Sequence, residues 1–401
     1  MIPELSKKSV ADVSLLGKRV LLRVDFNVPL GPGREILDDT RISAHLPTIN
    51  YILSKGAKLI VASHLDRPKG KVVPEMSLAP VAKRLDEMLE AKVSFVDDCV
   101  GPKVASAVAS LGEGEILLLE NIRFKPGETE NSPELAKQLA MLCDVYVDDA
   151  FSSAHRAHAS VVGVAKFVPE SVQGFLMEKD VFNLGKLLKS PIQPFIVILG
   201  GAKVKDKIGL INHLVGKVDT MAIGGGMCFT FLKAKGLGIG DSLLDEEHLA
   251  AVANLLDEAE SMGTRIVLPV DIVVAEDVSA EASARVVSAD KIPDGQKGLD
   301  IGPQTTNLFV SAIERAATVF WNGPMGVFEK PAFAKGTMAV AKALAGASAS
   351  ATTVVGGGET VSAVRAAGVA DRITHISTGG GASLEFLAGK TLPGIAALDD
   401  I

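Results

Sequence analysis

The sequence contains little cysteine. Cys99, Cys143 and Cys228 are the only three among 401 residues, and no two of them form a CxxC pair. An odd and widely spaced set argues against a disulfide scaffold and against a zinc site built on cysteine. We therefore expect three buried free thiols.

Long apolar runs and excess positive charge are also missing. No uncharged apolar stretch approaches the ~18 to 20 residues that a membrane-spanning helix needs. The N-terminal residues lack the uninterrupted apolar core of a secretory signal, so we expect a cytoplasmic protein. The formal net charge of −7 disfavours nonspecific binding to nucleic acid, which needs a broad basic surface.

The glycine-rich stretches lack two standard nucleotide-binding fingerprints. GGGMCF, GGGETV and GGGASL each lack the last glycine of GxGxxG, which weakens the hypothesis of a dinucleotide-dependent dehydrogenase. AGKT at 388–391 resembles the end of a P-loop, but Leu384 occupies the position of the first glycine. What remains is a set of turns in which a strand runs into glycines that open a helix.

Short apolar runs rich in Val, Ile and Leu alternate with helical stretches along the chain. The runs are RVLLRVDF, KLIVASHL, EILLLENIRF and DVYVDDAF in the first half, and PFIVILGG, TMAIGGG, RIVLPVDIVV, TVFWNGPMG and TTVVGGGE in the second. This pattern predicts an α/β fold with parallel sheets covered by helices, in two Rossmann-like domains. Ligands of such sheets bind at the carboxyl ends of the strands.

The second half places glycine and lysine at these strand ends. In FIVILGGAKVKDKIG (195–209) an apolar strand runs into Gly200 and Gly201. A helix beginning directly after the glycines would place Lys203 and Lys207 on one face and Lys205 on another. Glycine lets the backbone approach a phosphate, and a helix N-terminus favours negative charge. We therefore predict a site for a nucleotide diphosphate or triphosphate.

The first half places arginine and histidine at its strand ends. The residues are Arg23, Arg41, His64, Arg67, Arg123 and Arg156. Each taken singly is most often a surface ion pair. If they converge, their repulsion requires an anion, and guanidinium groups suit phosphate and carboxylate. His155 and His158 have HxxH spacing, but no third ligand lies nearby, so we expect structural roles for them.

Several longer stretches resemble phosphoglycerate kinase. They are RVDFNVP, SHLDRP, LLENIRF, DDAFSSAHRAHAS, LGGAKVKDKI, IGGGM, WNGPMGVFE, VVGGGET and STGGGASLEFL, which follow in the family's order from about Val20 to Gly394. The resemblance implies a phosphoglycerate-binding domain at 1–172, an interdomain helical hinge at 173–190 and a nucleotide-binding domain at 191–380. Residues 381–401 would return to the first domain.

The resemblance also implies the roles of individual residues. Phosphoglycerate would be bound by Asp25, Asn27, Arg41, His64, Arg67, Arg123 and Arg156. The nucleotide would be bound by Gly201, Lys203, Lys207, Gly225, Gly298, Asn322, Pro324, Glu329, Gly357, Gly358, Glu359 and Thr360. Catalysis would rest on Arg41, Lys207 and the helix N-terminus at Gly379 and Gly380, and Glu359 would bind Mg²⁺.

The implied reaction is reversible phosphoryl transfer from 1,3-bisphosphoglycerate to MgADP, giving 3-phosphoglycerate and MgATP in a monomeric glycolytic enzyme. No proton has to be abstracted in this exchange, which agrees with the lack of an evident general base. Catalysis then consists of in-line alignment and charge neutralisation. Each domain would hold one substrate, so the domains would have to close and expel water.

Three departures from the family's usual residues concern the implied site. Glu359 stands where aspartate is common, Asp66 where glycine is usual, and Ser152 and Ser153 replace Gly-Thr; each is expected to alter affinity without abolishing activity. Two alternative functions stay open at this point, an NAD-dependent dehydrogenase and a non-enzymatic binder of phosphorylated metabolites. Base preference and the amplitude of domain closure are not predicted.

Overall fold

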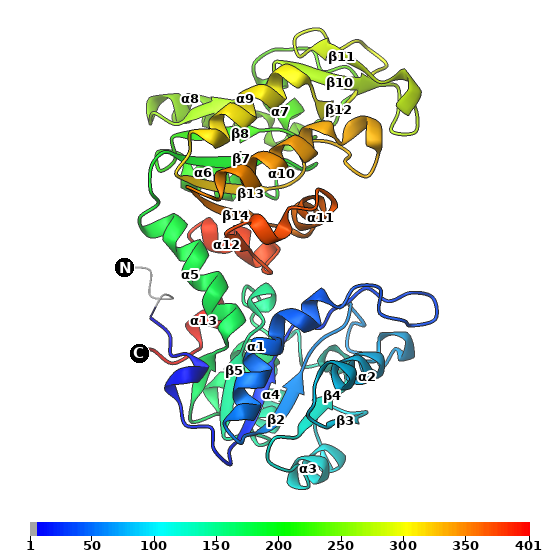
Figure 1. Cartoon of the computed structure of the whole chain (residues 1–401), viewed down its shortest axis with the longest axis vertical. Coiled ribbons are helices and arrows are strands. Elements are labelled where there is room, and N and C mark those ends of the chain that lie inside the picture. Colours follow the sequence, from blue (N-terminus) through cyan, green and yellow to red (C-terminus); the bar gives the residue numbers. More distant parts are fainter. Residues whose placement is uncertain (1–5) are drawn as a thin grey trace. The chain divides into compact units, whose positions relative to one another are not determined.

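A computed structural model describes residues 6–401, and the chain divides into two compact units. The first unit ends at Phe182 and also contains Thr391–Ile401, and the second comprises Asn183–Lys390. Helix α5 (Phe175–Lys189) crosses this boundary. Figure 1 shows that each unit consists of sheets flanked by helices. In this described part of the chain no helix is long and apolar enough to cross a membrane.

The first unit is built on a parallel six-stranded sheet in the order β3-β4-β2-β1-β5-β6. Its strands are β1 (Arg19–Arg23), β2 (Lys58–Ala62), β3 (Val93–Val96), β4 (Ile116–Leu119), β5 (Val145–Asp148) and β6 (Ser171–Gln173). Its other α-helices are α1 (Thr40–Ser54), α2 (Ala79–Met88), α3 (Pro102–Ala109), α4 (Pro133–Ala140) and α13 (Pro393–Ala396). Because the strands are parallel, their carboxyl ends meet at one edge of the sheet.

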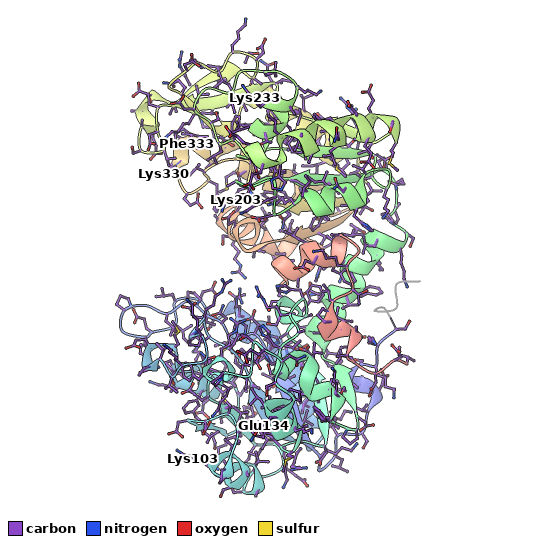
Figure 2. The ribbon with its side chains drawn as sticks, turned by 180° about the vertical axis from the view of Figure 1, so that it is seen from behind. Lys103, Glu134, Lys203, Lys233, Lys330 and Phe333 are labelled. Carbon is purple, nitrogen blue, oxygen red and sulfur yellow. The ribbon has the colours of Figure 1, made fainter. Side chains whose placement is uncertain are left out.

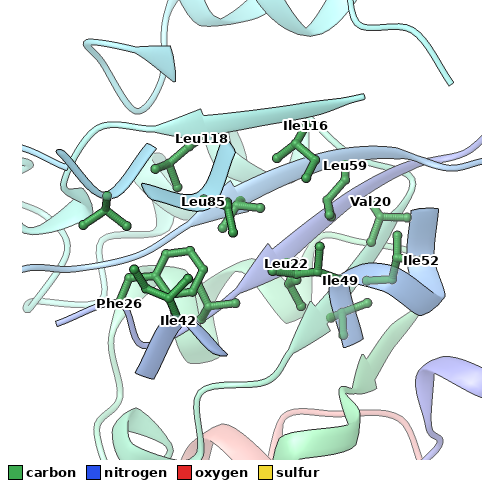
Figure 3. Close-up of a cluster of buried hydrophobic side chains, with 14 of the residues drawn as sticks. Val20, Leu22, Phe26, Ile42, Ile49, Ile52, Leu59, Leu85, Ile116 and Leu118 are labelled. Atoms are coloured by element: carbon green, nitrogen blue, oxygen red, sulfur yellow. The ribbon is translucent and has the colours of Figure 1, made fainter. Parts of the chain in front are cut away.

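The core of the first unit explains how β1 holds α1 in place. Val20 and Leu22 alternate along β1 and point to the same face of the sheet, where Ile42, Ile49 and Ile52 of α1 cover them (Figure 3). All five side chains are fully buried. Burial of one such side chain is worth about 1.5–3 kcal/mol, so this contact fixes the start of α1 beside the end of β1.

The N-terminal and C-terminal segments pair with each other in the first unit. The ammonium group of Lys7 is buried, donates to the carbonyl oxygen of Leu398 at 2.6 Å and forms an ion pair with Asp400 at 2.8 Å. The side-chain amide of Gln173 in β6 donates to the carbonyl of Lys7 at 3.1 Å. The last residues of the chain are therefore part of the first unit.

The second unit contains a parallel six-stranded sheet in the order β15-β14-β13-β7-β8-β9. Its strands are β7 (Phe195–Leu199), β8 (Thr220–Ile223), β9 (Arg265–Val267), β13 (Thr318–Asn322), β14 (Thr352–Gly356) and β15 (His375–Ile376). Its helices are α6 (Ile208–Leu214), α7 (Cys228–Ala234), α8 (Leu249–Ser261), α9 (Pro303–Glu314), α10 (Lys335–Ala347), α11 (Gly358–Ala366) and α12 (Gly381–Leu387). The two parallel sheets with their helices confirm the predicted α/β fold class.

A small antiparallel sheet in the second unit was not expected from the sequence. It has the order β11-β10-β12, with β10 at Asp271–Ala275, β11 at Arg285–Ser288 and β12 at Lys297–Ile301. The run RIVLPVDIVV reads as one strand but is divided between β9 and β10, which belong to different sheets. Pro269 lies between the two halves, and proline has no N–H with which to continue a ladder of hydrogen bonds.

Candidate functional sites in the two units

Asp25 is the centre of a polar cluster beyond the end of β1. One carboxylate oxygen accepts from the guanidinium of Arg41, in the first turn of α1, and from the hydroxyl of Ser152, both at 2.5 Å. The other oxygen lies 4.0 Å from Nε2 of His64. Burial opposes ionisation of Asp25, but the charge of Arg41 and the hydrogen bonds from the Ser152 hydroxyl and the N–H of Asn27 hold its pKa well below its usual range. Asp25 is therefore an ionised acceptor at neutral pH.

His64 is held in a defined tautomer by Arg23. The guanidinium of Arg23 lies 3.2 Å from Nδ1 of His64, and because arginine can only donate, Nδ1 is the acceptor. Burial lowers the pKa of His64 well below 6.5, and neighbouring arginines add to this effect. The ring is therefore neutral with its proton on Nε2. Arg23 itself is fully buried and also donates to Ser160 at 2.9 Å, so it positions His64 and is inaccessible to a ligand.

Asn27 and Arg123 are joined through the loop after β2. The main-chain N–H of Asp66 donates to the side-chain oxygen of Asn27 at 2.8 Å, and the guanidinium of Arg123 donates to the carbonyl of Asp66 at 2.8 Å. Asp66 has φ +53°, a left-handed conformation that glycine adopts most readily. Burial lowers the pKa of Arg123 to about 10, and Arg156 is among the cations that contribute to this.

The sequence-predicted residues of the first unit are thus partly assembled. Asp25, Arg41, His64 and Arg123 influence one another electrostatically, and Arg156 acts on Arg123. Arg67 follows Asp66 in the same loop and is exposed, as are Arg41 and Arg156. Sequence reasoning missed Ser152 as a partner of Asp25, although its place in DDAFSSAHRAHAS beside predicted residues was a usable signal. Clustered cations beside one carboxylate suit a small ligand that carries both anionic and hydroxyl groups.

The second unit contains a pocket of about 390 Å³ at the carboxyl ends of its parallel strands. Six residues that the sequence predicted for the nucleotide line it, namely Gly201, Gly225, Gly298, Pro324, Glu329 and Glu359. Sequence reasoning missed its apolar lining, which includes Phe229, Ile272, Leu299, Met325 and Val327. Ile272 and Leu299 belong to the unexpected antiparallel sheet and stand in no recognisable motif, whereas Met325 and Val327 lie within the motif WNGPMGVFE. A polar rim with an apolar interior is typical of a site for a flat organic ligand.

Glycine is required in this pocket because three loops touch backbone to backbone. A Cβ atom at Gly225, which has φ +61°, would lie 2.5 Å from the main-chain nitrogen of Gly201. A Cβ atom at Gly200 would lie 2.1 Å from the carbonyl oxygen of Pro324. The loops after β7, β8 and β13 are therefore closely packed, and part of the glycine signal reports this packing.

The expectation of a helix directly after Gly201 was wrong. α6 begins at Ile208 with Lys207 as its N-cap, and residues 202–207 form turns. Gly201 is tied on both sides, since its N–H donates to the carbonyl of Pro324 at 2.8 Å and its carbonyl accepts from Met227 at 3.0 Å. These two hydrogen bonds hold the chain after β7 in a non-helical conformation, and α6 begins only at Ile208. Lys203 and Lys207 consequently do not share a helical face.

The two lysines differ in their surroundings. Lys203, labelled in Figure 2, is exposed, whereas Lys207 is 9% exposed. The ammonium nitrogen of Lys207 lies 3.3 Å from the place where a Cβ atom of Gly201 would be, at the edge of the pocket. Burial lowers the pKa of Lys207, while Asp206 and Glu359 oppose this shift. Lys207 is thus a partly desolvated cation beside a lining carboxylate.

The glycine turn after β14 is held by two buried side chains. The amide of Asn322 donates to the carbonyl of Gly356 at 2.7 Å, and the hydroxyl of Thr360 accepts from the N–H of Gly323 at 2.7 Å. Asn322 and Thr360 are 3% and 1% exposed, so both brace the loops behind the pocket. Gly357 is the N-cap of α11 with φ +91°, Gly358 is the first residue of that helix, and Glu359 is exposed in its first turn.

The glycine turn after β15 opens α12 as the sequence predicted. Gly380 is the N-cap of the helix with φ +53°, and the N–H of Gly379 donates to the hydroxyl of Ser377 at 3.2 Å. A Cβ atom at Gly380 would meet nothing within 4 Å. The glycine there serves the backbone conformation of the turn and leaves open space around it.

Comparisons with known proteins agree on one family. The family model described as phosphoglycerate kinase matches residues 10–390. The phosphoglycerate kinases of Herpetosiphon aurantiacus and Moorella thermoacetica are 52% and 54% identical to the chain over 396 residues, covering 99% of the chain and 100% of each relative. The solved phosphoglycerate kinase of Coxiella burnetii is 40% identical, with a TM-score of 0.88 and 98% coverage of both chains. That of Pyrococcus horikoshii OT3 is 33% identical, with a TM-score of 0.83 and coverage of 97% of this chain and 98% of the other. The chain therefore belongs to the phosphoglycerate kinase family.

Proposed function

We propose that the chain catalyses reversible transfer of a phosphoryl group from 1,3-bisphosphoglycerate to MgADP, giving 3-phosphoglycerate and MgATP. The observation that carries this proposal is the pairing of two unlike sites on one chain of this family. One is a cluster of arginines around Asp25 and His64, and the other is a glycine-lined pocket with Lys207 at its edge. A phosphoryl acceptor and a phosphoryl donor need such different environments.

The first unit is suited to bind phosphoglycerate. Arg41 and Arg123, together with Arg67 and Arg156 in the exposed part of the cluster, offer guanidinium groups to phosphate and carboxylate oxygens. The Nε2–H of His64 donates, and the ionised carboxylate of Asp25 accepts from a substrate hydroxyl. Asn27 shapes the same loop through its bond to Asp66.

The second unit is suited to bind the nucleotide. The apolar side of the pocket accepts the base, and Glu329 accepts hydrogen bonds from the ribose. Main-chain N–H groups of the residues that follow Gly201 and of the turns at Gly357 and Gly380, with Lys203, contact the phosphates. Lys207 follows the phosphoryl group during transfer, together with Arg41 from the first unit, and neutralises charge that spreads over its oxygens. The reaction then requires the two substrates to be brought together by closure of the units.

Glu359 fits a Mg²⁺ ion carried by the nucleotide. No group of three or more His, Cys, Asp or Glu side chains within residues 6–401 could hold a metal ion, so the donor set lacks an all-protein cage. Mg²⁺ commonly takes one or two carboxylates together with phosphate oxygens and water. Glu359 offers one exposed carboxylate at the lining of the pocket. Bound there, Mg²⁺ supplies positive charge to the nucleotide phosphates.

We further infer that the protein is a cytoplasmic monomer with no nucleic-acid or membrane partner.

The deciding experiment measures ATP consumption with 3-phosphoglycerate, coupled to reduction of the acyl phosphate product. We expect turnover that requires ATP, 3-phosphoglycerate and Mg²⁺ together. Binding of 3-phosphoglycerate without nucleotide affinity would replace the proposal with a metabolite-binding function. Reduction of NAD by hydroxy acids in the absence of ATP would replace it with a dehydrogenase.

Asp66→Asn is expected to lower the KM for 3-phosphoglycerate without changing kcat. The carboxylate of Asp66 is exposed beside Arg67, and Arg123 donates only to the main-chain carbonyl of Asp66, so the carboxylate repels an anionic substrate. Asparagine tolerates the left-handed conformation at this position and removes only the charge. The interaction between two exposed charges contributes about 0.2–1 kcal/mol to a free energy of binding. Removing the repulsion should therefore lower the KM for 3-phosphoglycerate by up to about 5-fold.

The measurement compares KM at ionic strengths of about 0.01 M and about 1 M, where the screening lengths are about 30 and 3 Å. The decrease should be largest at low ionic strength and nearly vanish at high ionic strength. Glu130→Gln serves as the control, because it removes an exposed carboxylate elsewhere in the same unit. If the KM of the variant is unchanged at low ionic strength, the charge of Asp66 does not affect substrate affinity.

A further inference from the structure

A buried histidine–aspartate pair lies directly behind the substrate cluster of the first unit. His45 is on α1, one helical turn after Arg41, and is 2% exposed. Asp149 follows β5 directly and is fully buried. Nδ1 of His45 lies 2.8 Å from Oδ2 of Asp149. Sequence reasoning gave neither residue a role, and neither is among the groups that would touch the substrate.

The main chain of Asp25 decides the tautomer of His45. Its N–H donates to Nε2 of His45 at 3.0 Å, so Nε2 has to be free of a proton. The proton of the neutral ring therefore sits on Nδ1 and is donated to Asp149. Arg41 and His45, four residues apart on α1, thus hold Asp25 at two points: Arg41 contacts the carboxylate and His45 accepts from the main chain.

Asp149 carries the same network into the first turn of α5. Its second oxygen, Oδ1, accepts from the N–H groups of Leu176 at 2.8 Å and Met177 at 3.2 Å. A Cβ atom at Gly174 would lie 2.2 Å from Oδ1, so the chain approaches this carboxylate as closely as glycine allows. The carboxylate thereby satisfies two main-chain donors that have no partner within the helix.

We propose that His45 is a positioning residue for substrate binding, which fixes the main chain of Asp25 and, through Asp149, joins the phosphoglycerate site to the first turn of α5. This inference rests on the proposed function, because it assigns a role within the same site. His45 does not touch the substrate. It determines where the carboxylate of Asp25 stands when Arg41 and the substrate hydroxyl compete for it. The same bonds give α5, the helix that crosses the boundary between the two units, a fixed starting point on the site.

Three substitutions separate the two bonds of the ring. In His45→Gln the side-chain oxygen reaches the position of Nε2 and still accepts from Asp25, but the bond to Asp149 is lost. In His45→Asn the side-chain amide reaches the position of Nδ1 and still donates to Asp149, but the bond to Asp25 is lost. His45→Leu removes both bonds. All three lose the edge-on contact between His45 and Phe26, so this contact does not distinguish them.

We expect the KM for 3-phosphoglycerate to rise about 10-fold in His45→Asn and His45→Leu and to stay within about 2-fold of the wild-type value in His45→Gln. The KM for ATP should be unchanged in all three variants. His248→Leu is the matched control, because His248 forms a similar pair with Asp245 at 2.8 Å in the second unit without contacting Asp25. If folded Asn and Gln variants share the same KM, His45 has only a structural role and the proposal is wrong.

Amide hydrogen exchange without substrate gives a readout that does not depend on activity. The N–H of Asp25 should lose protection in the Asn and Leu variants and keep it in the Gln variant. The N–H groups of Leu176 and Met177 should lose protection in the Gln and Leu variants, where Asp149 has lost its histidine. Equal protection in all variants overturns the proposal. A wild-type protein without kinase activity overturns the proposed function instead, while this exchange pattern still reports whether the network exists.

Discussion

Lys207→Ala is expected to lower kcat about 10²–10³-fold while the KM for ATP changes less than about 3-fold. The ammonium group of Lys207 is partly desolvated at the edge of the glycine-lined pocket, where burial lowers its pKa and Glu359 opposes the shift. A cation held in such a place interacts more strongly as charge develops on a phosphoryl group in transfer than with the bound nucleotide. Loss of this ammonium group should therefore lower kcat more than it weakens binding of the nucleotide.

The measurement is steady-state kinetics of the coupled reaction with both substrates varied. Lys205→Ala is the matched control, because Lys205 is an exposed neighbour in the same turns, and it should retain wild-type kcat. Lys207→Arg should rescue little of the loss, since the ammonium nitrogen lies 3.3 Å from the place of a Cβ at Gly201 and leaves scant room for a planar guanidinium. If the KM for ATP rises as much as kcat falls, Lys207 is a ground-state binding residue and its proposed role is wrong.

The lysines also show where sequence reasoning about the site reached its limit. Their spacing suggested a shared helical face, but the loop that carries Gly201 is fixed by bonds to two other loops, and α6 begins only at Ile208. Spacing along the chain carries no information about contacts with distant loops. The structure places the ammonium group of Lys207 beside the glycine turn and leaves Lys203 exposed, and contact of either lysine with a phosphate stays a prediction.

The central strands of both parallel sheets could be predicted, whereas the edge strands β3, β6 and β15 could not. Buried strands such as β1, β5, β7 and β13 are covered on both faces. Each therefore contains at least three consecutive apolar residues, and the run is visible in the sequence. The missed edge strands, β3, β6 and β15, have only two to four residues and mix polar with apolar side chains. β11 is largely exposed, and its apolar residues are the pair Val286 and Val287.

The arginines of the first unit illustrate the same limit at the level of single residues. Both Arg23 and Arg41 were predicted to lie at strand ends. Arg23 does end β1 but is fully buried behind His64, whereas Arg41 lies in the first turn of α1 and is 48% exposed beside Asp25. Residues on a parallel strand alternate between faces, and the face that borders the site depends on which loops cover it. His45 and Asp149 gave no signal at all, because each acts through a main-chain group of another segment.

A second large effect is expected from Asp148, the last residue of β5. Its side chain is fully buried, and one oxygen accepts from the N–H of Ala150 at 3.0 Å. Burial raises the pKa of Asp148 to about 7, and the neighbouring Asp149 carboxylate adds to this, although Arg23 opposes it. The folded protein therefore keeps a proton on Asp148 that the unfolded chain, with the ordinary value of 3.8, has already released.

The sign of the pH dependence follows from this difference. Below about pH 4 both states hold the proton and Asp148 has no effect on stability. Between about pH 4 and pH 7 the folded state binds more protons than the unfolded state, so Asp148 lowers the free energy of unfolding as the pH rises. Above pH 7 this loss of stability no longer changes with pH. A difference of about 3 pKa units corresponds to at most ~4 kcal/mol. Asp148→Asn removes the ionisable group and keeps an oxygen for Ala150.

Asp148→Asn is therefore expected to raise the free energy of unfolding by about 2–4 kcal/mol at pH 8, and the midpoint of thermal unfolding by roughly 5–10 °C. Near pH 3 the variant and the wild-type protein should be almost equally stable, because Asp148 is then mostly protonated in both the folded and the unfolded chain. Calorimetry at several pH values between these limits measures the difference directly. Asp97→Asn is the control: its exposed carboxylate pairs with Lys103, which lowers its pKa, so its replacement should give no gain at pH 8. A gain for Asp148→Asn that is the same at pH 3 and pH 8 would show that ionisation of Asp148 is not its cause.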